Sequence, residues 1–334
     1  MNWKNASLYP CWKKRIDMNY IQKGFLGDLD WWRYVITIFI ILFGIGLFSL
    51  PHSLAIAAKV SDGGVDISRL EELSYLFSLF DANVNIVYMM LPFLGGLSAL
   101  FIAIKFLHKQ TITDLTTARK KIDWSRFLFS FLTWGGAILL GVGVIYFLNP
   151  ESLVLNLNWK PFLILCVIGV VLIPIQTSFE EYIFRGFLMQ GLGVLARNRW
   201  FPLLVTSVLF GLMHYANPEV DKLGKAVLLY YVGTGFLLGI ITLMDEGLEL
   251  SLGFHAANNL ITALLVTSDW TAFQTHSIFK DISEPELLSS VLPAFILYPI
   301  FLFILSRKYG WKNWKEKLTG DIFSIEIDEL DEIS

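Results

Sequence analysis

Residues 161–190 read PFLILCVIGVVLIPIQTSFEEYIFRGFLMQ. The first half of this stretch is an apolar run, and the charged residues Glu180, Glu181 and Arg185 follow directly after it. Burying such groups in an apolar environment costs free energy unless they are paired. We therefore expect these three side chains to have partners or a function.

The composition places this stretch in a membrane protein. Of the 334 residues, 55% are hydrophobic and only 16% are charged, whereas about a quarter of the residues of a soluble domain are charged. The net charge of -3 gives no reason to propose nucleic acid as a partner. We therefore predict an all-α polytopic membrane protein, with the lipid bilayer as its surroundings.

Eight apolar segments have about the length that crosses a bilayer as a helix, although the fifth is short. They are residues 34–50, 85–107, 127–148, 160–176, 201–214, 225–244, 250–267 and 288–305. We predict about eight transmembrane helices, with an active site in an intramembrane cavity among the fourth, fifth and seventh.

The distribution of basic residues predicts the orientation, because Lys and Arg near span ends collect on the cytoplasmic side. They gather in the N-terminal segment, in the loop after the second span and in the C-terminal tail. They are Lys4, Lys13, Lys14, Arg15, Lys23 and Arg33; Lys109, Arg119, Lys120 and Lys121; and Arg307, Lys308, Lys312, Lys315 and Lys317. We expect both termini to be cytoplasmic in a multi-pass protein of the plasma (inner) membrane.

Four regions follow from this topology. They are a cytoplasmic N-terminal segment (1–33), N-terminal transmembrane helices (34–150), a core (151–306) and a cytoplasmic tail (307–334). Within the second region, the loop 51–84 contains ISRLEELSYLFSLF, whose apolar residues recur at helical spacing. This pattern predicts an amphipathic helix at the membrane surface.

Helical geometry separates the two adjacent glutamates. If the fourth helix continues through residue 196, Glu181 and Arg185 stack one turn apart and form an ion pair. Glu180 then points elsewhere and lacks a partner on its own helix. An ionisable group in that position within a membrane is a functional candidate.

Two other predicted spans supply polar residues. His214 ends the fifth span, and His255 opens the seventh, with Asn259 one helical turn later. Asn258 lies on a different face from His255, so we expect it to miss a shared site. A lone intramembrane histidine is more often a packed residue than a catalytic one. The remaining histidines fall in predicted loops and are interpreted as ordinary: His52, His108 and His276.

Together these residues form three motifs: E-E-x-x-x-R at 180–185, F-x-x-x-H at 210–214 and H-x-x-x-N at 255–259. In this order on successive apolar helices, they resemble the motifs of the CPBP intramembrane proteases, also called the CAAX amino-terminal protease or Abi family. The similarity covers about residues 159–267, and TARKKIDWSRF at 117–127 resembles the segment that precedes the core in some bacterial members. No motif position departs from the pattern, and the N-terminal third carries no motif.

The resemblance implies an intramembrane endopeptidase. Peptide hydrolysis needs an activated water and donors for the oxyanion that develops on the carbonyl. By resemblance, Glu180 is the general base, His214 helps hold the water, and His255 and Asn259 donate to the oxyanion.

By resemblance, Glu181 and Arg185 would hold the helix in place and so fix the geometry of the catalytic side chains. The substrate would be a membrane-associated protein or peptide. Family members cleave prenylated proteins near a C-terminal CAAX sequence or are linked to peptide maturation and bacteriocin self-immunity, and the sequence does not choose among these.

Metal dependence is left open by the residues. Glu180, His214 and His255 are an acceptable ligand set for Zn²⁺. However, the chain has no H-E-x-x-H, and Asn259 fits an oxyanion donor better than a zinc ligand. We expect no cofactor, with Zn²⁺ as the alternative.

Two other classes of function compete with the peptidase. The first is a membrane scaffold or bacteriocin-immunity-type protein that keeps the fold without needing catalysis. The second is a transporter using the same polar groups. We rank the transporter last, because the sequence shows no internal repeat of the kind common in transporters.

Overall fold

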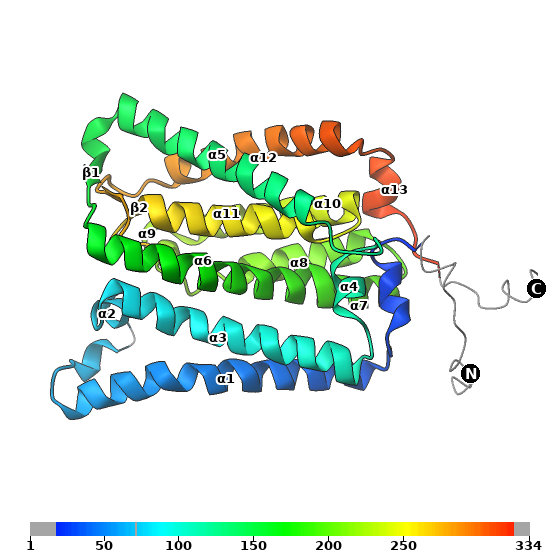
Figure 1. Ribbon diagram of the computed structural model, residues 1–334, viewed down its shortest axis with the longest axis horizontal. Coiled ribbons are helices and arrows are strands. Elements are labelled where there is room, and N and C mark those ends of the chain that lie inside the picture. The colour runs from blue at the N-terminus through cyan, green and yellow to red at the C-terminus, as the bar shows by residue number, and fades with distance from the viewer. Residues whose placement is uncertain (1–17, 71, 324–334) are drawn as a thin grey trace, which may run out of the picture.

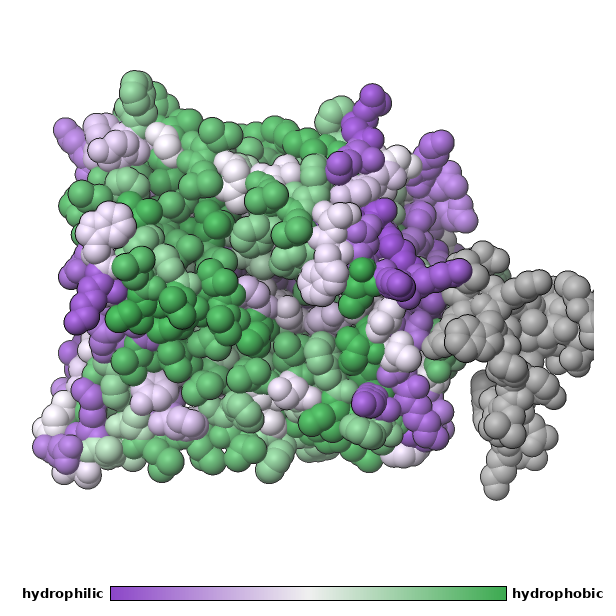
Figure 2. Space-filling model, viewed as in Figure 1, coloured by the Kyte–Doolittle hydropathy of each residue, from purple (hydrophilic) through white to green (hydrophobic). Residues whose placement is uncertain are grey.

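The computed structural model describes residues 18–70 and 72–323, and its helices run side by side in a bundle (Figure 1). Within these residues, six helical segments are long and apolar enough to cross a membrane. They are α1 (Trp31–Ser61), α3 (Ala82–Ile102) with the π-helical η4 (Ala103–Leu107), α5 (Trp124–Leu148), α6 (Trp159–Glu181) with η6 (Tyr182–Leu188) and α7 (Met189–Ala196), η7 (Lys225–Val227) with α10 (Leu228–Asp245), and α12 (Leu287–Tyr309). Figure 2 shows an apolar band between two polar ends. The chain is therefore an integral membrane protein.

Two further helices coincide with the fifth and seventh predicted spans. α8 (Trp200–Leu212) has 13 residues and α11 (Glu249–Leu265) has 17, which is short of the roughly 20 residues of a spanning helix. α11 packs against α5, α6 and α10, so protein surrounds most of it. The predicted count of eight spans is not confirmed, although all eight predicted segments are helical for most of their length.

The first predicted span, residues 34–50, is shorter than the helix that the structure shows. α1 continues past Pro51 to Ser61, because a proline removes only one backbone donor and is tolerated in membrane helices. His52 therefore lies on α1, where its ring stacks on Tyr88 at 5.1 Å, and not in a loop. In the loop that follows, the described residues form only η3 (Ile67–Arg69) and α2 (Leu73–Ser78), so the amphipathic helix is shorter than predicted.

The first and last described segments lie at the same end of the bundle. η2 (Gln22–Leu26), α4 (Ile112–Thr116) and α13 (Trp314–Thr319) all occur there (Figure 1). This arrangement agrees with an even number of crossings and with basic loops on one side. Residues 1–17 and 324–334, which are the outer parts of the two predicted cytoplasmic segments, lie outside the described residues. The cytoplasmic orientation stays a prediction.

A small sheet lies at the opposite end of the bundle and was not predicted. β3 (Phe279–Asp281) pairs antiparallel with β1 (Leu153–Leu155) and parallel with β2 (Val266–Thr267). The 3-10 turn η5 (Pro150–Ser152) leads into β1, and the short helix α9 (Pro218–Leu223) follows α8. Strands of two or three residues are too short to show an alternating pattern, so the all-α prediction needs this one correction.

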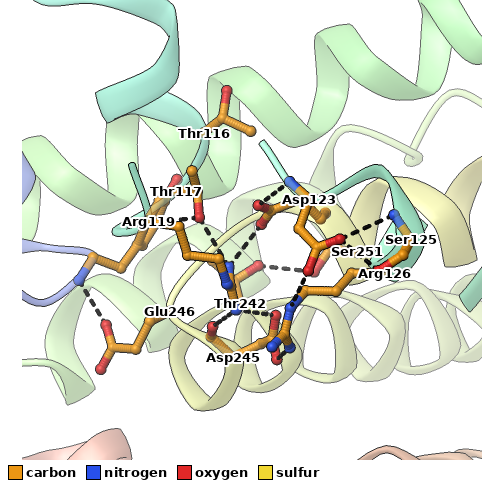
Figure 3. A network of polar contacts seen from close by, with 12 residues as sticks. Thr116, Thr117, Arg119, Asp123, Ser125, Arg126, Thr242, Asp245, Glu246 and Ser251 are labelled. Atoms are coloured by element: carbon orange, nitrogen blue, oxygen red, sulfur yellow. Dashed lines mark hydrogen bonds and ion pairs between the residues drawn. The ribbon is translucent and has the colours of Figure 1, made fainter. Parts of the chain in front are cut away.

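An ion network fixes the turn between α10 and α11 (Figure 3). Arg119 Nη2 lies 2.7 Å from Asp245 Oδ2, and Arg119 Nη1 lies 3.1 Å from Glu249 Oε2. Arg126 pairs with Asp245 Oδ1, and the Asp123 N–H donates to Glu249 Oε1. Segment 117–126 thereby holds the start of α11, which carries His255 and Asn259 further along the helix.

Two glycines allow α8 and α10 to approach closely. A Cβ at Gly235 would lie 2.6 Å from the Ser207 carbonyl oxygen, and one at Gly211 would lie 2.3 Å from Val232 Cγ2. Both distances are far below van der Waals contact, so larger residues would push the two helices apart. This crossing brings the end of α8 next to η6 and α10.

Candidate active site

The helix that begins at Trp159 continues without a break to Ala196, well past the predicted span of residues 160–176. Glu180 and Glu181 are the last residues of α6, and the π-helical η6 begins at Tyr182. π-helical segments occur frequently at functional sites. The charged part of this helix lies near its middle and not at its end.

Glu181 and Arg185 form the predicted ion pair. Arg185 Nη1 lies 3.1 Å from Glu181 Oε1, and both side chains are completely buried. Arg185 Nη2 also donates to the Gly235 carbonyl at 3.1 Å, and the guanidinium lies over the Phe210 ring at 4.3 Å. This arginine therefore connects η6 to α8 and α10.

Glu181 also holds His255. The His255 Nδ1 atom lies 2.8 Å from Glu181 Oε1. Because an ionised carboxylate only accepts hydrogen bonds, Nδ1 carries the proton. The other ring nitrogen, Nε2, lies 3.5 Å from Glu180 Oε2. Glu181 thus fixes the orientation of the His255 ring in addition to its contact with Arg185.

Glu180 has a partner on its own helix, contrary to our expectation. Gln176, one turn earlier, donates from Nε2 to Glu180 Oε1. The i, i+4 spacing of the two residues was visible in the sequence, but we had considered only charged partners. Among the described residues Glu180 Oε2 has no hydrogen-bond partner, and that atom is buried.

Asn259 joins the same cluster through Gln176. Its Nδ2 donates to Gln176 Oε1 at 3.0 Å, and its Oδ1 accepts from Asn258 Nδ2 at 3.1 Å. The Asn258 oxygen accepts from Trp134 Nε1 of α5 at 3.1 Å. No hydrogen bond joins Asn258 to His255 in the described part of the chain, as expected, but Asn258 contacts Asn259 directly. The sequence analysis missed this supporting role and that of Trp134.

His214 lies at the edge of the cluster. Its Nδ1 is 2.8 Å from the Phe210 carbonyl, and its ring stacks on Tyr231 with centroids 4.1 Å apart. The Phe210 ring lies 4.9 Å from His214 and 5.8 Å from His255. Within the described residues His214 makes no hydrogen bond to Glu180 or His255, so it joins the other predicted residues through aromatic contacts.

The same geometry bears on the metal alternative. The part of the chain that the structure describes has no group of three or more His, Cys, Asp or Glu side chains that could hold a metal ion. Glu180, His214 and His255 are not arranged as such a group, with His255 Nδ1 bonded to Glu181 and Phe210 packed against both histidine rings. We therefore derive no reaction step through zinc.

Comparisons with known proteins match the part of the chain that contains these residues. Residues 156–261 match the family described as type II CAAX prenyl endopeptidase Rce1-like, a range close to the one that carries the three motifs. The chain is 30% identical over 252 residues to the uncharacterized protein YyaK of Bacillus subtilis, and this alignment covers 75% of the chain and 83% of YyaK. No solved structure matches the chain.

Proposed function

Because the chain belongs to the Rce1-like family of type II CAAX prenyl endopeptidases, we propose that it is an intramembrane endopeptidase. Its reaction is hydrolysis of a peptide bond in a membrane-associated protein or peptide. One observation carries this proposal: the buried Glu180 Oε2 has no hydrogen-bond partner among the described residues and faces His255 Nε2.

In the proposed reaction Glu180 is the general base. Its Oε1 is engaged by Gln176, so Oε2 accepts the proton of the attacking water. His214 holds that water at the edge of the site. The protonated Glu180 then returns the proton to the leaving amine, which completes the hydrolysis.

His255 and Asn259 stabilise the oxyanion that develops on the scissile carbonyl. Asn259 uses its second N–H for this, because the first donates to Gln176. His255 donates from Nε2, which requires a proton on Nε2 as well as on Nδ1. The carboxylates of Glu180 and Glu181 lie on either side of the ring and would stabilise that charge.

The substrate enters the bundle from the membrane, so its reacting segment is apolar or carries a lipid. The family description favours a prenylated CAAX sequence. We further propose that the protein resides in the plasma membrane with both termini cytoplasmic. Such substrates would then reach the protein from the cytoplasmic side of the membrane.

The test uses the purified protein in proteoliposomes. The probe is a fluorescence-quenched farnesylated peptide that ends in a CAAX sequence, and the same peptide without the farnesyl group is its control. We expect cleavage by the wild type and none by Glu180→Gln at equal reconstitution. Equal cleavage by both proteins would contradict the role of Glu180.

Metal dependence is checked on the same preparation. Its zinc content is measured by elemental analysis before and after chelation. We expect full cleavage in protein that lacks zinc; loss of cleavage on chelation, restored by zinc, would replace the metal-free mechanism.

A further inference from the structure

A chain of hydrogen bonds links α5, α11 and α6 and ends on Glu180. It runs from Trp134 Nε1 to Asn258, from Asn258 to Asn259, from Asn259 to Gln176 and from Gln176 to Glu180. Trp134 and Gln176 are buried.

The direction of every bond in this chain is determined by its two ends. An indole N–H can only donate, and an ionised carboxylate can only accept. The amide oxygen of Asn258 must therefore face Trp134, and the amide nitrogen of Gln176 must face Glu180. The amide of Asn259 between them is held with its nitrogen toward Gln176, which leaves its second N–H for another acceptor.

We propose that Gln176 is a positioning residue that couples the carboxylate of Glu180 to the amide of Asn259. It has two effects, one through each end of its side chain. Its nitrogen stabilises the ionised carboxylate and occupies Oε1, so that Oε2 is the free oxygen. Its oxygen accepts from Asn259 Nδ2 and prevents the Asn259 amide group from rotating so that its oxygen and nitrogen exchange places. The role of both effects in catalysis rests on the proposed peptidase function. The coupling between Glu180 and Asn259 does not depend on that function.

Other charged groups also act on Glu180 and stay constant in the test. They are His255 from α11, His214 from the end of α8, and Glu181 and Arg185 from its own helix. α3, which packs on α6, contributes no acidic or basic side chain. A change made only at Gln176 therefore reports on its own hydrogen bond.

The experiment is chemical labelling of Glu180 in membranes by dicyclohexylcarbodiimide, which requires no peptidase activity. The protonated carboxyl adds across a C=N bond of the reagent, and the adduct rearranges to a stable N-acylurea without losing an atom. Labelling of the Glu180 peptide is followed by mass spectrometry against pH, and Glu180→Gln identifies the signal by its absence.

In Gln176→Leu, loss of a hydrogen bond to the charged form should move the labelling midpoint upward by about one pH unit. Gln176→Glu keeps the size and polarity of the side chain and moves the midpoint in the same direction, which guards against a folding defect in the leucine variant. Thr177→Val is the matched control, because Thr177 is buried on the same turn and, among the described residues, its side chain bonds only to the Pro174 carbonyl. An unchanged midpoint in both Gln176 variants would overturn the proposal.

The peptide assay adds a second readout. Gln176→Leu should lower kcat roughly 10-fold to 100-fold and move the acidic limb of the pH profile upward, with KM little changed. Equal kcat and pH profile for Gln176→Leu and wild type would overturn the positioning role. If the labelling midpoint moves but the wild type cleaves no peptide, the coupling stands and the proposed function fails.

Discussion

Among the described residues, the buried acidic and basic side chains at the turn between α10 and α11 differ from those in the middle of the bundle in how completely the acids are paired. At the turn between α10 and α11, both oxygens of Asp245 and both oxygens of Glu249 have partners. In the middle of the bundle, Glu180 and Glu181 each leave one buried oxygen without a hydrogen-bond partner among the described residues.

The difference separates a structural role from a chemical one. A fully paired buried acid has no free acceptor for a substrate or a water, and losing a partner leaves a costly buried charge. An acid with a free oxygen gives up part of that stabilisation and can accept a proton. We infer that the first cluster holds α11 in place and that the second carries out the reaction. The predictions below test this division.

The largest effect is expected for Glu180→Gln. Removing the general base should reduce cleavage of the farnesylated peptide by roughly 1,000-fold or more. The free energy of unfolding should stay at or above that of the wild type, because an incompletely paired charge is removed. Cleavage and unfolding by SDS titration in mixed micelles are measured on the same preparation. A large loss of stability with cleavage retained would reverse the roles of the two clusters.

The same substitution in the other cluster should have the opposite result. Glu249→Gln leaves Arg119 without one of its buried carboxylates and should lower the free energy of unfolding by about 3 kcal/mol. Cleavage per folded molecule should be unchanged. Glu72→Gln is the control, because its ion pair with Arg69 is half-exposed and should contribute no measurable stability. Equal stabilities for the two variants would show that pairing at the turn is not structural.

Glu181→Gln should affect both properties, since Glu181 contacts both Arg185 and His255. A neutral amide can still accept from His255 but no longer stabilises its charged form. Cleavage should fall roughly 10-fold to 100-fold, and the protein should lose stability because Arg185 becomes an unbalanced buried charge. Cleavage and SDS unfolding measure the two losses. Unchanged cleavage would show that Glu181 supports only the fold.

The smallest effect is expected at the remote end of the hydrogen-bond chain. Trp134→Phe removes the donor to Asn258 while keeping an aromatic ring in the core. Stability should fall by about 1 kcal/mol and cleavage only a few-fold, as measured in the same two assays. A loss of cleavage as large as that of Glu180→Gln would place Trp134 in the reaction itself.

Much of the fold follows from hydrophobicity and helical period. The apolar segments located the helices, and the i, i+4 spacing predicted the Glu181–Arg185 pair, which is confirmed. The length of α1 was missed because Pro51 was interpreted as an end. The three-stranded sheet was missed because its strands are too short to show a period.

The candidate site could be predicted residue by residue but not contact by contact. The motifs named the charged and histidine residues, whereas Gln176, Asn258 and Trp134 are neutral side chains that no charge pattern marks. Their roles depend on how α5, α6 and α11 pack together, and the sequence of a single segment does not predict this packing. His214, which we predicted to help hold the water, contacts this cluster through the ring of Phe210, and its own ring stacks on Tyr231.

The most direct test of the central claim compares wild type with Glu180→Gln in the native membrane. The abundance and termini of membrane-associated proteins and peptides are measured by mass spectrometry, at equal levels of the two proteins. We predict a species that accumulates uncut only in the variant, which would identify both the activity and the substrate. Identical termini and an identical cellular phenotype would contradict the peptidase and support a membrane scaffold or immunity protein that keeps the site without using it.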